Sequence, residues 1–120
     1  MFAACLRSVI EPGAALRVES PDTQGVPIAI FHTDDDEFYA VDDTCTHQDA
    51  SLADGWLEGC EVECPLHASR FDLRTGTVDA PPAKRPIRTH RVQVTDDVVY
   101  VTMSPHAPSP ASDASLFPPS

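Results

Sequence analysis

The sequence predicts an all-β fold, a small antiparallel β-sandwich or incomplete barrel. Short runs in which apolar and polar residues alternate recur between turn signals, a pattern typical of strands in antiparallel sheets. The chain of 120 residues holds 12 prolines and 5 glycines, which favours a loop-rich chain over a helix bundle. This length is sufficient for one domain with its own hydrophobic core.

Six segments carry the strand pattern, and two polar connections separate neighbouring segments. The predicted strands are, in chain order, 15–19, 26–31, 38–41, 61–63, 87–94 and 98–103. Residues 32–37 and 95–97 have the length of hairpin connections, so the acidic run between the second and third strands is interpreted as a solvated turn. His32 and His90 are expected on strand surfaces, and Cys5 in a strand near the amino terminus.

The pattern changes between residues 42 and 84, where Cys, His, Gly and Pro accumulate and the strand-like runs shorten. We therefore expect a single domain over 1–103, with a base formed by 1–41 and 85–103 and a loop-rich subdomain inserted at 42–84. Trp56 is expected to pack beneath this subdomain. Residues 104–120 are rich in Pro, Ser and Ala and predict a flexible C-terminal tail.

The charge balance restricts the classes of partner. Eight basic and 19 acidic residues give a formal net charge of -11, which repels phosphate backbones and anionic lipids. No nucleic acid or membrane partner is therefore expected. The sequence shows no stretch long and apolar enough to span a bilayer and no signal peptide at its start, so a cytoplasmic location is expected.

Two short motifs pair a thiolate with an imidazole. Cys45-Thr46-His47 has the two ligand types two positions apart, and Cys64-Pro65-Leu66-His67 has them three positions apart. In a reducing compartment this pattern favours metal ligation over disulfides. Two sulfur and two nitrogen ligands would converge if the two loops packed side by side.

The order of the ligands separates two kinds of metal site. Zinc fingers place cysteine near cysteine and histidine near histidine along the chain, whereas here each motif offers one of each. The interleaved order suits a binuclear 2Fe-2S cluster in which two thiolates hold one iron and two imidazoles hold the other. Cys60 is interpreted as a free thiol, because four ligands are already present.

These motifs, together with Arg70-Phe71-Asp72-Leu73-Arg74-Thr75-Gly76, resemble a Rieske-type ferredoxin of a bacterial aromatic-ring-hydroxylating dioxygenase system. The resemblance spans roughly residues 3–103. It implies a Rieske fold and one 2Fe-2S cluster, with Cys45 and Cys64 on the inner iron and His47 and His67 on the outer iron. It also implies a third, proline-bearing loop at 79–83 that covers the cluster.

The resemblance also implies the reduction potential of the cluster and the residues that influence it. Respiratory Rieske proteins have a disulfide where this chain has Ala50 and Leu66, and a tyrosine where it has Phe71, so one hydrogen bond to a ligand sulfur is missing. Ser69 matches a serine that bonds a cluster sulfide. We expect a potential near the low end of the range of roughly -150 to +300 mV.

The function implied by the resemblance is single-electron transfer without catalysis. The chain has no dinucleotide-binding G-x-G-x-x-G motif and no mononuclear iron triad, so it is not expected to be an enzyme alone. The implied partners are an NAD(P)H-dependent flavoprotein reductase and the terminal Rieske oxygenase. Two alternatives stay open: the small Rieske-like subunit of a nitrite reductase, and a zinc-binding interaction module without a redox role.

Overall fold

The computed structural model describes residues 1–23, 25–44, 51–64, 70–78 and 87–104. Within these ranges the regular structure consists of strands and three short 3₁₀ helices, which confirms the predicted all-β fold. The strands are β1 (Phe2–Leu6), β2 (Ala15–Val18), β3 (Ile28–His32), β4 (Phe38–Asp42), β5 (Trp56–Glu58), β6 (Glu61–Glu63), β7 (Arg70–Asp72), β8 (Thr89–Thr95) and β9 (Val98–Thr102). The 3₁₀ helices are η1 (Arg7–Val9), η2 (Pro21–Thr23) and η3 (Leu52–Asp54).

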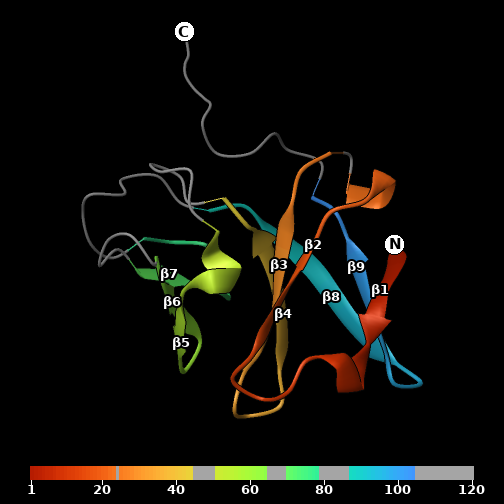
Figure 1. Cartoon of the computed structure of the whole chain (residues 1–120), viewed down its shortest axis with the longest axis horizontal. Coiled ribbons are helices and arrows are strands. Elements are labelled where there is room, and N and C mark those ends of the chain that lie inside the picture. Colours follow the sequence, from red (N-terminus) through yellow and green to blue (C-terminus); the bar gives the residue numbers. More distant parts are fainter. Residues whose placement is uncertain (24, 45–50, 65–69, 79–86, 105–120) are drawn as a thin grey trace, which may run out of the picture.

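Six strands form one antiparallel sheet in the order β1-β9-β8-β4-β3-β2 (Figure 1). The β3–β4 and β8–β9 hairpins lie next to each other, joined by pairing of Ala40 with His90 and of Val41 with Thr89. Because the inserted segment leaves the sheet after β4 and returns to it at β8, this pairing closes the insertion between them. Asp36, Asp96 and Asp97 supply positive φ angles in the hairpin connections, a conformation that Asp tolerates better than most residues.

The strand β3 is buried on both faces, and it separates two hydrophobic cores. Ile28 and Ile30 point into a core formed with β4, β9 and the segment after η1, while Ala29 and Phe31 point into a second core shared with the inserted segment. This division follows from the two-residue side-chain period of a strand. The continuous apolar run of β3 is the sequence signal of burial on both faces.

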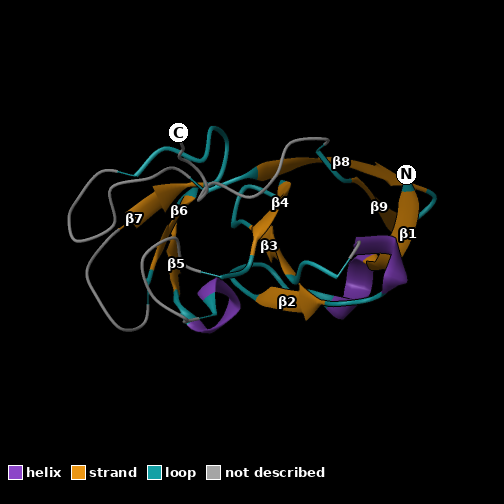
Figure 2. Ribbon diagram, turned by 90° about the horizontal axis from the view of Figure 1, so that it is seen from above, coloured by secondary structure: helices purple, strands orange, loops and turns teal. Residues whose placement is uncertain are grey.

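The second sheet has three antiparallel strands in the order β5-β6-β7. Figure 2 shows this sheet at one end of the molecule and β1 at the other. Its inner face contributes Val62 and Phe71, both fully buried, to the core that Ala29 and Phe31 also enter. The small sheet is therefore attached to the large one through shared apolar packing.

All six predicted strands are present, each within two residues of its expected ends. Sequence patterns predicted β6 but missed β5 and β7, two other three-residue strands in the segment expected to be loop-rich. For β1 they gave only the position of Cys5. Among the described residues, no helix has the length and apolar character needed to cross a bilayer. The domain boundaries at 1–103 and 42–84 stay predictions.

Three expectations about individual side chains were wrong. His32 and His90 are buried, not on strand surfaces, because each ring finds a carboxylate partner: His32 Nε2 lies 2.7 Å from Asp36 Oδ1, and His90 Nε2 lies 2.8 Å from Asp42 Oδ1. Trp56 is 61% exposed, because it is on the outer face of the three-stranded sheet while Leu57 takes the inner position.

Candidate metal centre

The predicted ligand Cys64 follows directly after β6 and is fully buried. The other three predicted ligands, Cys45, His47 and His67, lie outside the described residues, as do Ala50, Leu66, Ser69 and the predicted proline loop at 79–83. The described part of the site consists of the residues that flank these segments and the environment of Cys64.

The residues on either side of the segment 45–50 pair with each other through their backbones. Thr44 forms a β-bridge with Ser51, and the backbone N–H of Leu52 donates to the carbonyl oxygen of Asp43 at 2.7 Å. The residues on either side of the first predicted motif are thus held side by side. A loop closed in this way has less conformational freedom to lose when its ligands bind a metal.

The other two predicted loops also begin and end at hydrogen-bonded positions. Glu63 pairs with Arg70 across β6 and β7, which closes the segment 64–69. Gly76 accepts a hydrogen bond from the backbone N–H of Ile87 at 2.8 Å, and Phe71 forms a β-bridge with Val78, so the ends of 79–86 are joined as well.

The bases of the three loops meet in one hydrophobic core. Leu52 follows the first loop, Cys64 begins the second, and Ile87 follows the third, and all three residues are buried in the same cluster. The remaining buried members of this cluster are Ala29, Phe31, Val41, Val62, Phe71 and Leu73. The tertiary packing thus brings together residues that flank three separate segments of the chain, two of which carry the predicted ligands.

Asp43 holds the first loop to the sheet. Its buried carboxylate accepts hydrogen bonds from Ser51 Oγ at 2.8 Å and from the backbone N–H of Ala53 at 2.9 Å. Arg17 on β2 approaches the second carboxylate oxygen, with Nε 3.1 Å from Oδ2. A carboxylate with several charge-assisted partners compensates the cost of its own burial.

The carboxylate of Asp42 points away from that of Asp43 and contacts a different part of the sheet. Its Oδ1 lies 2.8 Å from His90 Nε2 and 3.2 Å from Arg88 Nε, so the end of β4 is fixed to β8. Consecutive residues of an extended chain point in opposite directions, which explains why two neighbouring aspartates serve two different elements. Neither aspartate was identified from the sequence as a structural anchor. The signal that could have indicated this role is the pair of carboxylates between an apolar strand and Cys45.

The hydrogen bonds of His90 determine which ring nitrogen carries the proton. The backbone N–H of Ser104 donates to Nδ1 at 3.0 Å, so Nδ1 is an acceptor. Nε2 must then carry the hydrogen and donate it to Asp42. Ser104, the first residue of the predicted tail, also donates through Oγ to the carbonyl oxygen of Thr89 and accepts from Arg88 Nη1 through its own carbonyl oxygen, so it is fixed to β8.

The described cysteines differ in their suitability as ligands. Cys5 and Cys60 are half-buried, whereas Cys64 is enclosed by apolar side chains at the meeting point of the three loops, and none of these three forms a disulfide. Burial raises the pKa of the Cys5 thiol, which keeps it protonated and inert. Within the described ranges no three His, Cys, Asp or Glu side chains form a separate metal cluster.

The surroundings of Cys64 fit an iron-sulfur cluster. A thiolate is the soft ligand that such clusters use, and an apolar shell limits solvent access and tunes the potential. Phe71 belongs to this shell and offers no hydroxyl group to the sulfur. The donor type, its burial and the convergence of the loop bases are therefore compatible with a cluster bound through Cys64.

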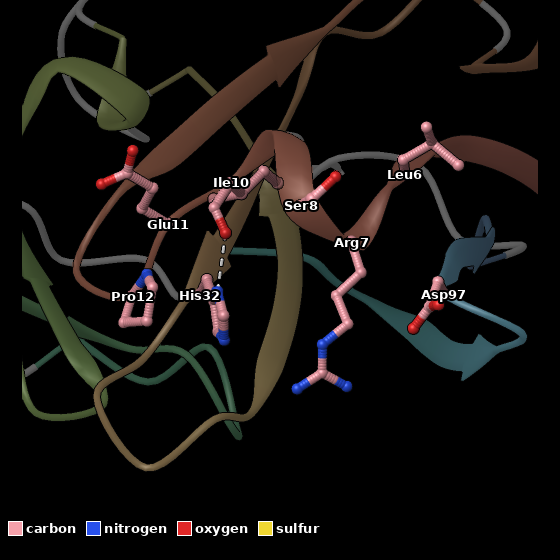
Figure 3. Close-up of a pocket in the computed structure, with 8 residues that line it drawn as sticks. All are labelled: Leu6, Arg7, Ser8, Ile10, Glu11, Pro12, His32 and Asp97. Carbon is pink, nitrogen blue, oxygen red and sulfur yellow. Dashed lines mark hydrogen bonds between the residues drawn. The ribbon is translucent and has the colours of Figure 1, made fainter.

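A cavity of about 640 Å³ lies away from this core, beside η1 and the β8–β9 turn (Figure 3). His32 donates from Nδ1 to the carbonyl oxygen of Ile10 at 2.7 Å, and its ring stacks on Phe38 with centroids 4.0 Å apart. Arg7 and His32 both contact Asp36, so the guanidinium of this cavity already has a carboxylate partner. None of its lining residues belongs to the core around Cys64.

Comparison with known proteins agrees with this interpretation of the site. The family model of the Rieske [2Fe-2S] domain matches residues 2–93. The 3-phenylpropionate/cinnamic acid dioxygenase ferredoxin subunit of Photorhabdus laumondii subsp. laumondii is 45% identical over 102 residues, which cover 83% of this chain and 91% of that protein.

Solved structures give the same result. A chain from the complex of reduced oxygenase and oxidized ferredoxin in carbazole 1,9a-dioxygenase is 36% identical with a TM-score of 0.76, over 84% of this chain and 100% of that one. A NADH-dependent nitrite reductase small subunit from Mycobacterium tuberculosis has a TM-score of 0.71 over 85% of this chain and 96% of that chain, but at 22% identity it shows the fold alone. The family match and the relatives confirm the resemblance seen in the ligand motifs, and the chain belongs to the Rieske [2Fe-2S] domain family.

Proposed function

We propose that this chain is a one-electron carrier of an aromatic-ring dioxygenase system and that Cys45, His47, Cys64 and His67 bind its 2Fe-2S cluster. The observation that carries the proposal is the burial of Cys64 in the core on which the bases of three loops converge. The set of ligand types, two thiolates and two imidazoles in interleaved order, suits a Rieske centre. The bound cluster supplies reversible one-electron chemistry.

The protein's own residues would position and insulate this centre. Asp43 fixes the loop that carries the first motif through Ser51 and Ala53. Phe71 and Leu73 keep water from the Cys64 side. Because Phe71 adds no hydrogen bond that would stabilise the reduced, more negative cluster, a low potential within the Rieske range follows.

The names of the relatives support a position between a reductase and an oxygenase. Several are named as ferredoxin subunits or components of dioxygenase systems, and one related ferredoxin was solved in complex with its oxygenase. This chain would take an electron from an NAD(P)H-dependent flavoprotein reductase and pass it to the terminal oxygenase. It would act in the cytoplasm as a carrier and not as an enzyme alone.

The two alternatives have less support. The nitrite reductase small subunit shares the fold at 22% identity, far below the 45% of the dioxygenase ferredoxin subunit. A zinc module would use the same four side chains but would give a colourless protein without redox activity. The ferredoxin assignment combines the interleaved ligand order with relatives of 41–45% identity over most of the chain.

The test is low-temperature EPR of the dithionite-reduced protein combined with four substitutions. His67→Ala and Cys64→Ser should abolish the Rieske signal, because nitrogen ligation of one iron and thiolate ligation of the other define it. The matched controls His106→Ala and Cys60→Ser should retain the signal. A Rieske signal that survives His67→Ala would disprove the ligand set, and a colourless wild-type protein containing zinc would disprove the electron-transfer function.

A further inference from the structure

The outer face of the three-stranded sheet carries an exposed tryptophan among carboxylates. Inward-facing Leu57, Val62 and Phe71 alternate with outward-facing residues, as the strand period requires. We define the acidic sheet face as the outward residues Trp56, Glu58, Glu61, Glu63 and Arg70. Trp56 is 61% exposed, and an exposed side chain of this size is characteristic of interaction surfaces.

Among the described residues, the carboxylates of this face outnumber the cations that contact them. Arg70 Nη1 lies 3.7 Å from Glu58 and 4.0 Å from Glu61, and its Nε lies 3.5 Å from Glu63. One guanidinium thus serves three carboxylates, which leaves a formal charge of about -2 on the face. These side chains, with Trp56, line a depression of about 290 Å³.

Along the chain, the acidic sheet face adjoins the segment that carries two of the predicted cluster ligands. Glu63 directly precedes the buried Cys64, and Arg70 begins β7 three residues after His67. A molecule bound to this face would contact Glu63 and Arg70, the residues that flank in sequence the segment with two of the four predicted ligands. An electron-transfer partner needs such a position, since redox encounters use small contact areas close to the redox centre.

We propose that the acidic sheet face binds an arginine-bearing basic patch of the protein that exchanges electrons with this chain. This inference rests on the proposed function and adds the docking surface. A guanidinium stacks on an indole ring and also forms paired hydrogen bonds with carboxylates, so arginine suits Trp56 and its acidic neighbours better than lysine. A second copy of this chain is a poor occupant, because its own net charge of -11 repels this face.

The first test uses Trp56 itself as the reporter. It is the single tryptophan of the chain, so a change in fluorescence reports occupancy of this face. We expect a blocked tetra-arginine peptide to change the fluorescence of the purified holoprotein at low salt, and a tetra-lysine peptide to require a higher concentration. The triple variant Glu58→Gln, Glu61→Gln, Glu63→Gln should weaken arginine-peptide binding by about tenfold.

The matched control removes the same number of negative charges from the connections of the six-stranded sheet. The variant Glu11→Gln, Asp34→Asn, Glu37→Gln changes three exposed carboxylates outside the acidic sheet face. It should bind the arginine peptide as the wild type does. Equal weakening in both triple variants would show that the peptide senses only the net charge, and the docking proposal would be overturned.

The second test measures the rate of electron transfer to a basic redox protein. The rate constant for electron transfer from the reduced protein to mitochondrial cytochrome c, a basic haem protein, should fall roughly tenfold in the acidic-face triple variant and also in Trp56→Ala. Both variants must retain the wild-type EPR signal and reduction potential. Unchanged rates in both variants would overturn the proposal.

The two readouts separate this inference from the proposed function. The peptide titration requires the folded face but not the redox activity, whereas the EPR signal requires the cluster but not the face. A wild-type protein without a Rieske signal refutes the proposed function, and with it the redox partner. A protein with the signal but without selective effects of the acidic-face substitutions refutes the docking surface alone.

Discussion

Replacing Gly76 with alanine should destabilise the protein more than the same replacement at a glycine that has open space around it. Gly76 has a φ angle of +81°, a conformation that favours glycine. A Cβ atom at this position would lie 2.1 Å from the carbonyl oxygen of Ile87 and 3.2 Å from Thr89 Cγ2. The obstacle is backbone, so the turn and the start of the segment leading to β8 would have to separate.

The magnitude follows from two costs. The left-handed conformation costs an alanine about 1–2 kcal/mol relative to glycine. Displacing packed backbone adds about 1–3 kcal/mol and weakens the hydrogen bond from the Ile87 N–H to the Gly76 carbonyl oxygen, which is 2.8 Å long. The expected loss of unfolding free energy is about 2–5 kcal/mol.

Two other glycines isolate the two costs. Gly59 has a φ angle of +61°, and no atom lies within 4 Å of the place that a Cβ would occupy, so Gly59→Ala should show only the conformational cost. Gly55 has an ordinary φ angle of -82°, but its Cβ would lie 2.2 Å from the carbonyl oxygen of Glu63, so Gly55→Ala should show only the steric cost.

The assay is urea unfolding followed by far-UV circular dichroism at equal cluster occupancy. With a urea m-value of about 2 kcal/mol/M for a small domain, Gly76→Ala should lower the midpoint by about 1–2.5 M and Gly59→Ala by about 0.5–1 M. If the two variants had the same midpoint, the contact between Gly76 and Ile87 would not restrict the fold, and the reasoning from the 2.1 Å approach would be refuted.

Two further predictions concern Asp36 and Phe71. Hydrogen bonds from His32 and then Arg7 lower the pKa of Asp36 from its ordinary value of 3.8, so its contribution to stability is present above that pH and is lost as the pH falls through the lowered pKa. Asp36→Asn, which tolerates the positive φ angle, should therefore reduce the acid-induced fall in the urea midpoint; an unchanged pH profile would contradict this. Phe71→Tyr should raise the reduction potential measured by protein-film voltammetry if its hydroxyl reaches a ligand sulfur, while Phe38→Tyr in the other core should leave it unchanged. A lowered potential in Phe71→Tyr would contradict the carry-over from respiratory Rieske proteins.

Local sequence patterns were sufficient for most of the strands. Alternation is a property of each strand by itself, so the β3–β4 and β8–β9 hairpins could be predicted from the residues that form them. The three-residue strands β5 and β7 could not, because they are stabilised by pairing with β6 and by the shared core rather than by their own propensity. The ligand motifs were likewise visible locally, since metal chemistry restricts which residue types occur together.

The burial of the histidines depended on partners that are distant in the sequence. His90 is 48 residues from Asp42, and nothing near His90 in the sequence indicates that a carboxylate will meet its ring. Trp56 shows the opposite error: a large aromatic residue predicts packing, but the register of β5 against β6 places Leu57 inward and leaves the indole outward. A shift of one residue in a strand reverses its faces, and register is fixed by tertiary pairing.

The sequence by itself determined the all-β class, the family and the chemistry of the predicted ligand set, because these depend on residue types and short spacings. Only the tertiary structure decided that the bases of three loops meet around Cys64, that Asp43 holds the base of the first loop while Asp42 fixes β4 to β8, and that Trp56 and its acidic neighbours form one exposed face. The physical reason is that burial, ion pairing and strand register arise from contacts between segments that are far apart along the chain, and each segment alone carries no information about its partner.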